Sequence, residues 1–285
     1  MPLSQKEKAE RFRALHQRPG TLVIPNPWDA GTARILTSLG FEALTTTSAG
    51  LAFTLGRRDA RAAVTREETL ANARAIVEAT DLPVAADLEN GYGDAPEAAA
   101  LTIRQAGELA GLVGGSIEDA SGDPKRPIYD FAHAVERIAA AVEAARALPF
   151  PFTLVGRAEN YLHGRPDLDD TIRRLQAYEA AGVDVLFAPG VVKPEEIRKI
   201  CSAVRQPVNL VMGPKGFTLS VAEIAELGIK RISLGSALSR AALGGFIRAA
   251  QEVRQKGTFS FLSDVVTSAD ANGYMAEPPL RGSKA

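Results

Sequence analysis

The sequence predicts an α/β fold: a (β/α)8 barrel of the TIM type with one additional helix in front. Short apolar runs alternate with amphipathic helical patterns along most of the 285-residue chain, and such alternation is typical of a parallel sheet. Eight strand signals fit a closed barrel, because eight β–α units in about 250 residues are the usual size of that fold. The alternative is an open, doubly wound sheet. No Gly-x-Gly-x-x-Gly turn follows the first strand, which weakens a dinucleotide-binding version of that alternative.

The expected elements follow from hydrophobic periodicity and from Gly, Pro and capping signals at their ends. Strands are expected at 21–25, 43–46, 83–86, 115–117, 152–155, 183–187, 208–211 and 231–234. Helices are expected at 4–17, 27–38, 65–79, 95–110, 129–148, 167–181, 193–204, 219–227 and 236–256. We expect a polar turn at 46–50 and a loop from there to about Val64. Thr65 and Glu68 have the spacing of a capping box.

The chain is expected to form one domain over residues 1–285, because Pro and Gly punctuate its loops throughout and no linker divides it. Residues 257–285 form a C-terminal extension. A short apolar patch lies at 259–266, and the low apolar content beyond it predicts a partly mobile end.

Composition excludes several classes of protein. Hydrophobic residues make up 46% and charged residues 24% of the chain, as in ordinary globular proteins. The net charge of -1 provides no basic field for nucleic acid. A single cysteine, Cys201, excludes an internal disulfide framework. The N-terminus lacks the apolar core of a signal peptide, and no apolar run is long enough for a bilayer span. We therefore expect a cytoplasmic protein without nucleic-acid or membrane partners.

Unusual polar side chains fall at the ends of five expected strands. They are Thr46-Thr47-Ser48, Asp87 with Glu89, Glu118 with Asp119, Arg157, and Asn209. In a barrel the C-terminal ends of the strands meet at one mouth, where catalytic residues lie. Charges that only solvate the surface would instead scatter over the helices. The sequence therefore predicts an active site at this mouth.

The segment 83–94 carries a signal for a metal site. Asp87 and Glu89 are two residues apart, so their side chains would point the same way in an extended chain. Unpaired buried carboxylates are costly, and Mg²⁺ favours one or two carboxylates together with water and substrate oxygens. The alternative is a polar loop in which Asp94 caps the next helix. No Cys or His cluster has zinc spacing, so zinc is not expected.

The residue types at the mouth indicate a small anionic substrate. Arg157 can bind a carboxylate or phosphoryl group through two parallel hydrogen bonds, although an ion pair with Glu118 is the alternative. The turn at 46–50 can offer N–H groups to an anion or to a developing enolate oxygen. Together with a metal, these groups suit a 2-oxo or 2-hydroxy acid.

Other polar residues have simpler interpretations. Asp119 could cap the following loop or bind the metal, and Asp59 could be a surface charge. His16 and His133 lie on expected helices and are predicted to be on the surface. Cys201 is expected to pack rather than react.

Five motifs together resemble those of the isocitrate lyase/phosphoenolpyruvate mutase superfamily. They lie at 26–30, 55–59, 87–93, 117–119 and 156–157, in the order and spacing of that superfamily. The resemblance covers about residues 5–260. It implies a (β/α)8 barrel, Mg²⁺ as cofactor with Mn²⁺ as a substitute, and a 2-oxo or 2-hydroxy acid as substrate. It also implies a homo-oligomer, a dimer or tetramer, in which a C-terminal helix is swapped between subunits. The apolar segment 236–266 suits that exchange.

The resemblance implies roles for individual carboxylates. Asp87 corresponds to the main metal ligand. Glu89 stands where relatives usually have a second aspartate, and Glu118 corresponds to a third carboxylate that acts partly through water. Asp59 corresponds to a loop acid that approaches the metal-bound waters.

It also implies roles for substrate-binding residues. The hydroxyl and amide groups of Thr46, Thr47 and Ser48 would bind the substrate carbonyl or carboxylate. Arg157 would bind a carboxylate, and Asn209 would contact the distal part of the substrate. Arg157, Thr47, Ser48 and Asp59 are the expected catalytic residues.

Three departures from the superfamily separate this chain from its recognisable branches. Isocitrate and methylisocitrate lyases have a Lys-[Lys/Arg]-Cys-Gly-His loop, but residues 120–129 here are shorter and lack cysteine. Lyases place a glutamate where this chain has residues 188–190. The oxaloacetate decarboxylase branch has a histidine where this chain has residues 235–236.

The sequence therefore predicts a Mg²⁺-dependent lyase that cleaves or forms a C–C bond in a small 2-oxo or 2-hydroxy di- or tricarboxylate. A phosphoenolpyruvate mutase or phosphonopyruvate hydrolase, which act on P–C bonds, is one alternative. A non-catalytic binder of 2-oxo acids, such as 2-oxoglutarate or oxalate, is another. The proton carrier stays open between Tyr92 and a metal-bound water.

Overall fold

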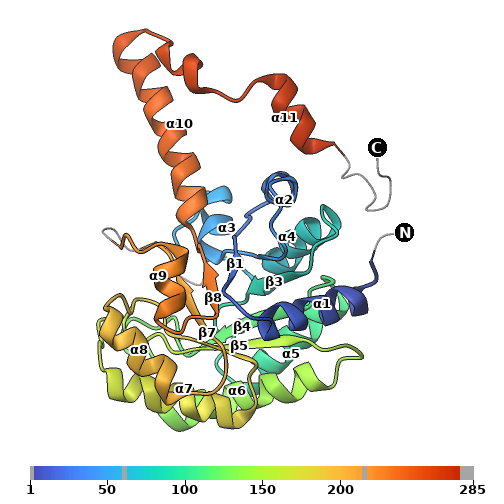
Figure 1. The fold of residues 1–285 in the computed structure, drawn as a ribbon, viewed down its shortest axis with the longest axis vertical. Helices are drawn as coiled ribbons and strands as arrows, with labels where there is room; N and C mark the ends of the chain where they lie inside the picture. Colours follow the sequence, from blue (N-terminus) through green and yellow to red (C-terminus); the bar gives the residue numbers. More distant parts are fainter. Residues whose placement is uncertain (1–2, 60–62, 214–216, 277–285) are drawn as a thin grey trace.

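The computed structural model describes residues 3–59, 63–213 and 217–276, and a parallel sheet of eight strands forms the centre of this part of the chain (Figure 1). The strands are β1 (Leu22–Ile24), β2 (Leu44–Thr45), β3 (Val84–Asp87), β4 (Gly114–Glu118), β5 (Thr153–Arg157), β6 (Val185–Phe187), β7 (Val208–Val211) and β8 (Arg231–Ser233). Their order is β1-β8-β7-β6-β5-β4-β3-β2. The two ends of the sheet are joined by a hydrogen bond from the Thr45 N–H to the Pro25 carbonyl at 3.1 Å and by one from the Asn26 side-chain amide to the Thr46 carbonyl at 2.8 Å. The predicted barrel is therefore confirmed as nearly closed.

Helices surround the sheet, and each expected helix is present within a few residues of its predicted ends. They are α1 (Gln5–Gln17), α2 (Ala30–Ser38), α4 (Arg66–Glu78), α5 (Pro96–Glu108), α6 (Phe131–Arg146), α7 (Leu168–Ala181), α8 (Pro194–Ala203), α9 (Val221–Glu226) and α10 (Ala237–Lys256). The structure adds α3 (Ser48–Thr54), the 3₁₀ turn η1 (Ser260–Asp264) and α11 (Ser268–Met275). None of the described helices combines the length and apolar character that a membrane span requires.

The expected turn at 46–50 is wrong, because these residues begin α3. Thr47 is the N-cap, and its hydroxyl accepts a hydrogen bond from the Gly50 N–H at 3.2 Å. Leu51 and Ala52 are buried with Val64 in a small apolar cluster. The run of Thr and Ser favours a loop, but the same residues are preferred N-caps. Here the cap lies at the barrel mouth.

The first helix, α1, packs across the N-terminal ends of the strands. Phe12 and Leu15 are buried there with Leu22 and Val113. His16 was expected on the surface, but only 6% of it is exposed, and its Nδ1 lies 2.8 Å from the Phe12 carbonyl oxygen. The prediction failed because the last turn of α1 faces the barrel.

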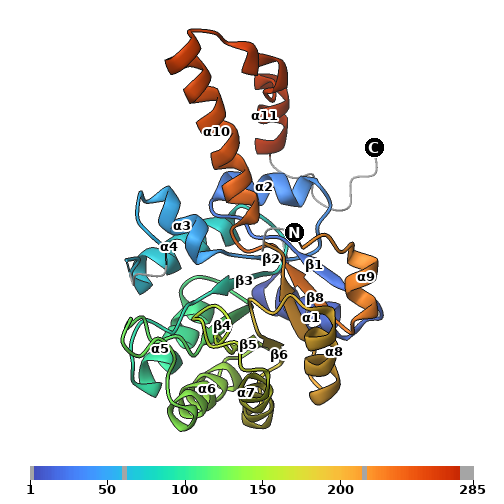
Figure 2. The ribbon, with the colours of Figure 1, turned by 90° about the vertical axis from the view of Figure 1, so that its left-hand side faces the viewer.

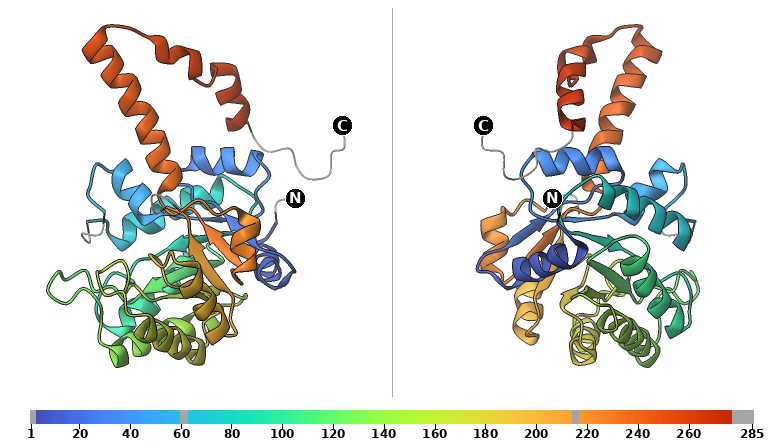
Figure 3. Two further views of the ribbon diagram at one scale, coloured as in Figure 1. Left: turned by 60° about the vertical axis from the view of Figure 1, so that its left-hand side comes forward. Right: turned by 90° about the vertical axis from the view of Figure 1, so that its right-hand side faces the viewer.

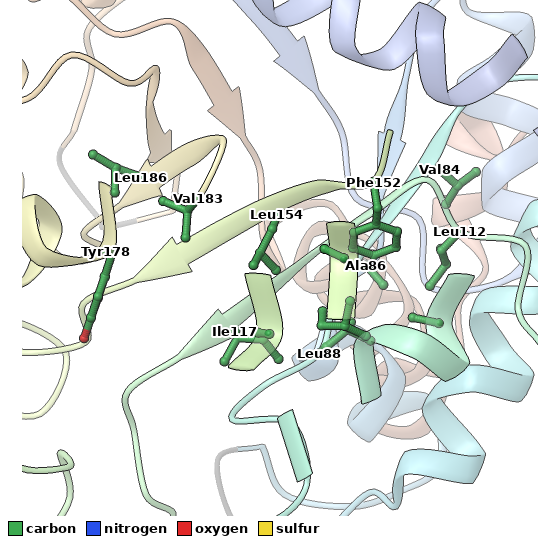
Figure 4. Packing of buried hydrophobic residues seen from close by; sticks show 14 of the residues in the cluster. Val84, Ala86, Leu88, Leu112, Ile117, Phe152, Leu154, Tyr178, Val183 and Leu186 are labelled. Atoms are coloured by element: carbon green, nitrogen blue, oxygen red, sulfur yellow. The ribbon is translucent and has the colours of Figure 1, made fainter. Parts of the chain in front are cut away.

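The main apolar core lies between the strands and the surrounding helices, as Figure 4 shows. Ala86 of β3, Ile117 of β4, and Phe152 and Leu154 at β5 gather there. This rigid scaffold fixes the ends of the strands, from which the polar side chains project.

The last helices leave the barrel. Figures 1, 2 and 3 show α10 projecting away from the strands and the chain then returning through η1 and α11. The guanidinium of Arg34 on α2 donates to the Met275 carbonyl oxygen at 3.0 Å, which ties α11 back to the barrel. Residues 257–276 thus contain more regular structure than expected, and the predicted mobile end at 277–285 lies outside the described residues.

Candidate active site at the barrel mouth

A cavity of about 200 Å³ lies at the C-terminal ends of the strands. Seven predicted site residues line it: Thr46, Thr47, Ser48, Asp59, Asp87, Arg157 and Asn209. They come from β2, α3, the following loop, β3, β5 and β7. The predicted convergence is thus present in the structure. A larger hollow of about 370 Å³ lies between α5 and α6, away from the strand ends, and another of about 440 Å³ lies beside the mouth.

Arg157 is the centre of a charge cluster. Its Nη1 donates to Asp87 Oδ1 at 2.9 Å, and its Nη2 lies 3.1 Å from Glu118 Oε2. Both Nε and Nη2 contact Glu159 Oε1, at 3.0 and 2.9 Å. The predicted alternative of an ion pair with Glu118 is therefore present. Nε and Nη1 each donate one hydrogen bond to these carboxylates, while Nη2 lies within ion-pair distance of Glu118 and Glu159.

The cluster holds more negative than positive charge. Burial opposes the charge of Arg157, but Glu159, Glu118 and Asp87 outweigh it and raise the pKa of Arg157. Burial raises the pKa of Glu118, and to a lesser extent that of Glu159, despite the attraction of Arg157. One guanidinium cannot neutralise three carboxylates, so the cluster has a deficit of positive charge.

Asp87 is fixed by β2 and α3. Its Oδ2 accepts a hydrogen bond from the Ser48 hydroxyl at 2.9 Å, and its N–H donates to the Thr46 hydroxyl oxygen at 3.1 Å. Both Asp87 oxygens have protein partners, and the side chain still lines the cavity.

Glu89 does not have the extended geometry that its spacing predicted. The strand ends at Asp87, and Glu89 has a φ of 47°, so the backbone here is not extended and the two-residue spacing does not align the two side chains. Glu89 lines a neighbouring cavity with Tyr92 and Ser121. Burial, then Asp87 and Asp59, raise the pKa of Glu89 to about 7. Glu89 is therefore near the cluster without lining the same cavity.

Asp119 has a structural position. It is fully buried and points to α7, where Oδ2 accepts from Arg174 Nη1 at 3.0 Å and from the Tyr178 hydroxyl at 2.7 Å. Its Oδ1 accepts from the Glu159 N–H at 2.8 Å. Of the two interpretations of Asp119, the structural one agrees with these contacts. The residue positions Glu159 rather than facing the cavity.

Other candidate residues lie at the edge of the site. The Tyr92 hydroxyl donates to Thr69 at 2.8 Å, and burial raises the pKa of Tyr92 well above its usual value; both facts make it a poor proton carrier. Asp59 is exposed at the cavity rim.

Asp94 accepts a hydrogen bond from the Tyr129 hydroxyl instead of capping α5 with its side chain. Cys201 is half-buried, and burial raises the pKa of its thiol to about 11, in agreement with packing.

The shortened segment 120–129 folds back on itself. Ala120 and Ile128 form an antiparallel bridge, and the Ser121 N–H donates to the Pro127 carbonyl at 3.0 Å. Lys125 at its tip is exposed. The segment is thus a compact loop beside the mouth.

The sequence analysis missed several residues that face the cavity or the cluster. Glu159 follows Arg157 by two residues, and this spacing could have identified it. Arg231 and Ser233 both line the cavity from β8; a charged residue within an apolar strand was the available signal. Asn26 supports the rim, because its Oδ1 accepts from the N–H groups of Leu234 and Gly235.

The carboxylate oxygens of the cluster fit a hard divalent cation that has few protein ligands. No three Asp, Glu, His or Cys side chains in the described parts of the chain are arranged to hold a metal by themselves. Mg²⁺ needs only one or two carboxylates, with water and substrate supplying the other oxygens. Asp87 and Glu118 offer such oxygens, and the deficit of positive charge around Arg157 suits a cation.

A family model described as phosphoenolpyruvate phosphomutase matches residues 12–254. The chain belongs to this family. The resemblance drawn from the motifs is therefore confirmed for the isocitrate lyase/phosphoenolpyruvate mutase superfamily as a whole, whereas the branch without the cysteine loop stays a prediction.

Several relatives of this phosphoenolpyruvate phosphomutase family member are similar over most of the chain. An oxaloacetate decarboxylase of Bradyrhizobium diazoefficiens is 32% identical over 219 residues, which cover 74% of this chain and 73% of that protein. A 2,3-dimethylmalate lyase of Eubacterium barkeri is 31% identical over 229 residues, 77% of each chain. A solved Burkholderia cenocepacia J2315 protein, named only provisionally as a lyase/mutase, is 59% identical with a TM-score of 0.93, covering 96% of this chain and 97% of that one.

Proposed function

We propose that this protein is a Mg²⁺-dependent carbon–carbon lyase that acts on a small 2-oxo or 2-hydroxy di- or tricarboxylate. The observation that carries the proposal is the cluster of Asp87, Glu118 and Glu159 around Arg157 at the barrel mouth. Three carboxylates surround one guanidinium, and this excess of negative charge suits a metal ion. A chelating acid substrate would supply the remaining ligands of that metal. The names of the decarboxylase and lyase relatives support the same class of reaction.

Asp87 would be the principal ligand of Mg²⁺ or Mn²⁺, with Glu118 and Glu89 acting directly or through water. When bound, the ion would supply a positive charge to the substrate carboxylate and the adjacent oxygen. Arg157 would hold Asp87 and Glu118 in place, because its guanidinium forms ion pairs with both of them and with Glu159. Its second Nη1 proton would reach a substrate carboxylate.

Thr47 and Ser48 would bind the oxygen that becomes an enolate. The Thr47 oxygen accepts the Gly50 N–H, so its own proton is available for a substrate. The Ser48 proton is donated to Asp87, and its contribution would come from its N–H at the start of α3. Asp59 at the rim would exchange protons with solvent, and Asn209 would contact the distal end of the substrate.

A substrate screen tests the proposal. The protein is incubated with Mg²⁺ and a set of 2-oxo and 2-hydroxy di- and tricarboxylates, and release of a 2-oxo acid is measured. Metal-dependent cleavage of at least one acid is expected, with loss of activity in EDTA and recovery with Mn²⁺. Absence of any metal-dependent turnover would contradict the lyase assignment.

A phosphonate enzyme is the second candidate, because the matching family model carries the description phosphoenolpyruvate phosphomutase. Phosphonopyruvate is therefore included in the same screen, with phosphorus NMR of the products. Formation of phosphoenolpyruvate or phosphate would favour this candidate over the C–C lyase.

We also propose that the protein forms a dimer or tetramer in which α10 packs on a neighbouring subunit. Its outer face exposes Leu243, Phe246 and Ile247, and Trp28 and Phe53 line an apolar cavity of about 210 Å³ beside Leu243 and Phe246. Exposed apolar surface of this kind is typical of an interface.

A further inference from the structure

A second arginine of the cavity, Arg231 on β8, has unused hydrogen-bonding capacity. It lines the cavity with only 4% of its surface exposed. Its Nε and Nη1 atoms are buried and have no hydrogen-bond partner in the described residues. Burying a guanidinium without an anion is costly. Such a group needs a counter-charge, and the cavity is where one can enter.

Within the described parts of the chain, no carboxylate forms an ion pair with Arg231 or raises its pKa. The neighbours of Arg231 in the sheet register are Leu22 of β1 and Asn209 of β7. His16 of α1 lies toward the N-terminal end of the barrel. Its pKa is lowered to about 4 by burial and then by the charge of Arg231. A neutral imidazole and apolar side chains therefore lie beneath the guanidinium. Burial lowers the pKa of Arg231 itself to about 10, so it stays charged at neutral pH.

The two arginines of the cavity differ in this respect. Arg157 forms ion pairs with three carboxylates, those of Asp87, Glu118 and Glu159, whereas Arg231 has no ion pair among the described residues. Ser233 on the same strand accepts from the Asn209 amide at 3.0 Å, so its own hydroxyl proton can be donated to a carboxylate oxygen. Asn209 lies next to Arg231 in the sheet, and its buried Oδ1, which has no partner in the described residues, suits a donor such as a substrate hydroxyl.

We propose that Arg231 binds the distal carboxylate of the substrate and so selects a dicarboxylic acid. The inference rests on the proposed function, which places the reacting end of the acid at Asp87, Thr47 and Ser48. The second carboxylate then lies against β7 and β8, at the opposite part of the cavity lining. A cavity of about 200 Å³ restricts the ligand to a small acid.

A competing explanation is an internal water that bridges Arg231 and the unpartnered Nε2 of His16. Buried waters commonly satisfy such groups. In that case Arg231 supports the barrel floor, and its replacement lowers stability without changing ligand preference. Ligand preference is therefore the measurement that separates the two explanations.

The test uses two acids that differ only at the distal end: malate and 2-hydroxybutyrate, in which a methyl group replaces the distal carboxylate. Dissociation constants are measured by calorimetry with Mg²⁺ for the full-length protein, Arg231→Met and Arg231→Lys. The exposed Arg74→Met variant is the control. We expect the unmodified protein and the control to bind malate at least about tenfold more tightly, Arg231→Lys to keep part of this preference, and Arg231→Met to lose it.

Each result decides a different point. Binding of both acids without a preference for malate, or an unchanged preference in Arg231→Met, overturns the role of Arg231 while the proposed function stands. Binding of neither acid to the unmodified protein overturns the selection of a dicarboxylic acid by Arg231, whereas the proposed function is overturned only if the substrate screen also shows no metal-dependent turnover. If Arg231→Met does not fold, the preference of the unmodified protein and the behaviour of Arg231→Lys give the same decision.

Discussion

Asp87 joins the two halves of the candidate site at the scale of single residues. One of its oxygens binds Arg157 and the other accepts the Ser48 hydroxyl. The carboxylate is therefore held between the charge cluster and the start of α3. In the proposed function, a residue with this position would bind the metal without supporting the core.

The first prediction concerns Asp87→Asn. We expect this variant to lose Mg²⁺ binding by calorimetry and to lose at least about a hundredfold in turnover, because a neutral amide is a poor ligand for a hard cation. The fold should persist, as judged by circular dichroism, since the side chain lies at the cavity surface. Asp169→Asn, an exposed acid on α7, is the matched control. Full activity in Asp87→Asn would refute the metal assignment.

The second prediction concerns Asp119, which is buried against Arg174 and Tyr178. Asp119→Asn should lower the free energy of unfolding by about 3 kcal/mol, because it leaves a buried guanidinium with one carboxylate fewer. Urea unfolding measures the change. Asp123→Asn, which removes a long and exposed contact with Arg126, should cost less than about 1 kcal/mol. Equal effects of the two substitutions would contradict the structural role.

At this scale the sequence predicts which residues meet, but not how they are oriented. Residues at strand ends could be identified because parallel strands deliver their C-terminal ends to one place. The positive φ of Glu89 could not be predicted, since such a conformation is rare outside glycine and depends on tertiary contacts. The two-residue spacing of Asp87 and Glu89 therefore led to the wrong prediction that their side chains point the same way. Arg231 was not predicted because it stands at the start of its strand, next to Lys230, whereas site residues were expected only at strand ends.

At the scale of elements, α1 and α3 show how helices at the two ends of the barrel control the site. The N-terminus of α3 contributes Ser48 to Asp87, while α1 brings His16 beneath Arg231. Helix α1 was predicted from periodicity, because its apolar face is clear. The start of α3 was not predicted, because Thr and Ser are common both in loops and at the N-caps of helices.

The third prediction follows from the burial of His16. Its pKa is near 6.5 when unfolded and about 4 when folded, so folding favours the neutral imidazole. The stability that this provides is present above pH 6.5 and is lost as the pH falls through about 4, a change of about 3 kcal/mol.

His16→Gln has no imidazole to titrate. The fall in its free energy of unfolding between about pH 7 and pH 4 should therefore be smaller than in the unmodified protein by about 3 kcal/mol. Denaturant unfolding at both pH values measures the difference. Because Arg231 contributes to the shift, Arg231→Met should reduce the acid sensitivity in the same direction. Identical pH profiles for His16→Gln and the unmodified protein would count against a buried neutral His16.

At the scale of the whole molecule, α10 departs from an otherwise compact barrel. Phe246 on this helix is 72% exposed, and Phe259, Leu262, Val265 and Val266 are exposed in the segment after it. The apolar pattern of 236–266 could be predicted from sequence, and so could the nearly closed barrel, because eight β–α units fit few other folds. The direction in which α10 leaves the barrel could not be predicted, because it depends on contacts with residues that are distant in the sequence.

The fourth prediction tests whether this surface joins subunits. Phe246→Asp should reduce the molar mass measured by light scattering after gel filtration, because a carboxylate cannot be buried in an apolar interface without a partner. Leu109→Asp is the control, because Leu109 is 60% exposed at the end of α5. A monomeric unmodified protein, or an equal loss of mass in both variants, would argue against an interface formed by α10.

The pairing of β1 with β8 has a consequence for the order of folding. In the described sheet β1 has its only strand ladder with β8, and the Leu22 N–H donates to the Lys230 carbonyl across more than two hundred residues of chain. Contacts between such distant residues form late, because a long loop must close first. During synthesis, β1 therefore leaves the ribosome long before β8 is available to pair with it. Until the sheet is complete, the apolar side chains of Phe12 and Leu15 on α1 lack part of the surface that buries them in the folded protein, and they are open to aggregation or to a chaperone.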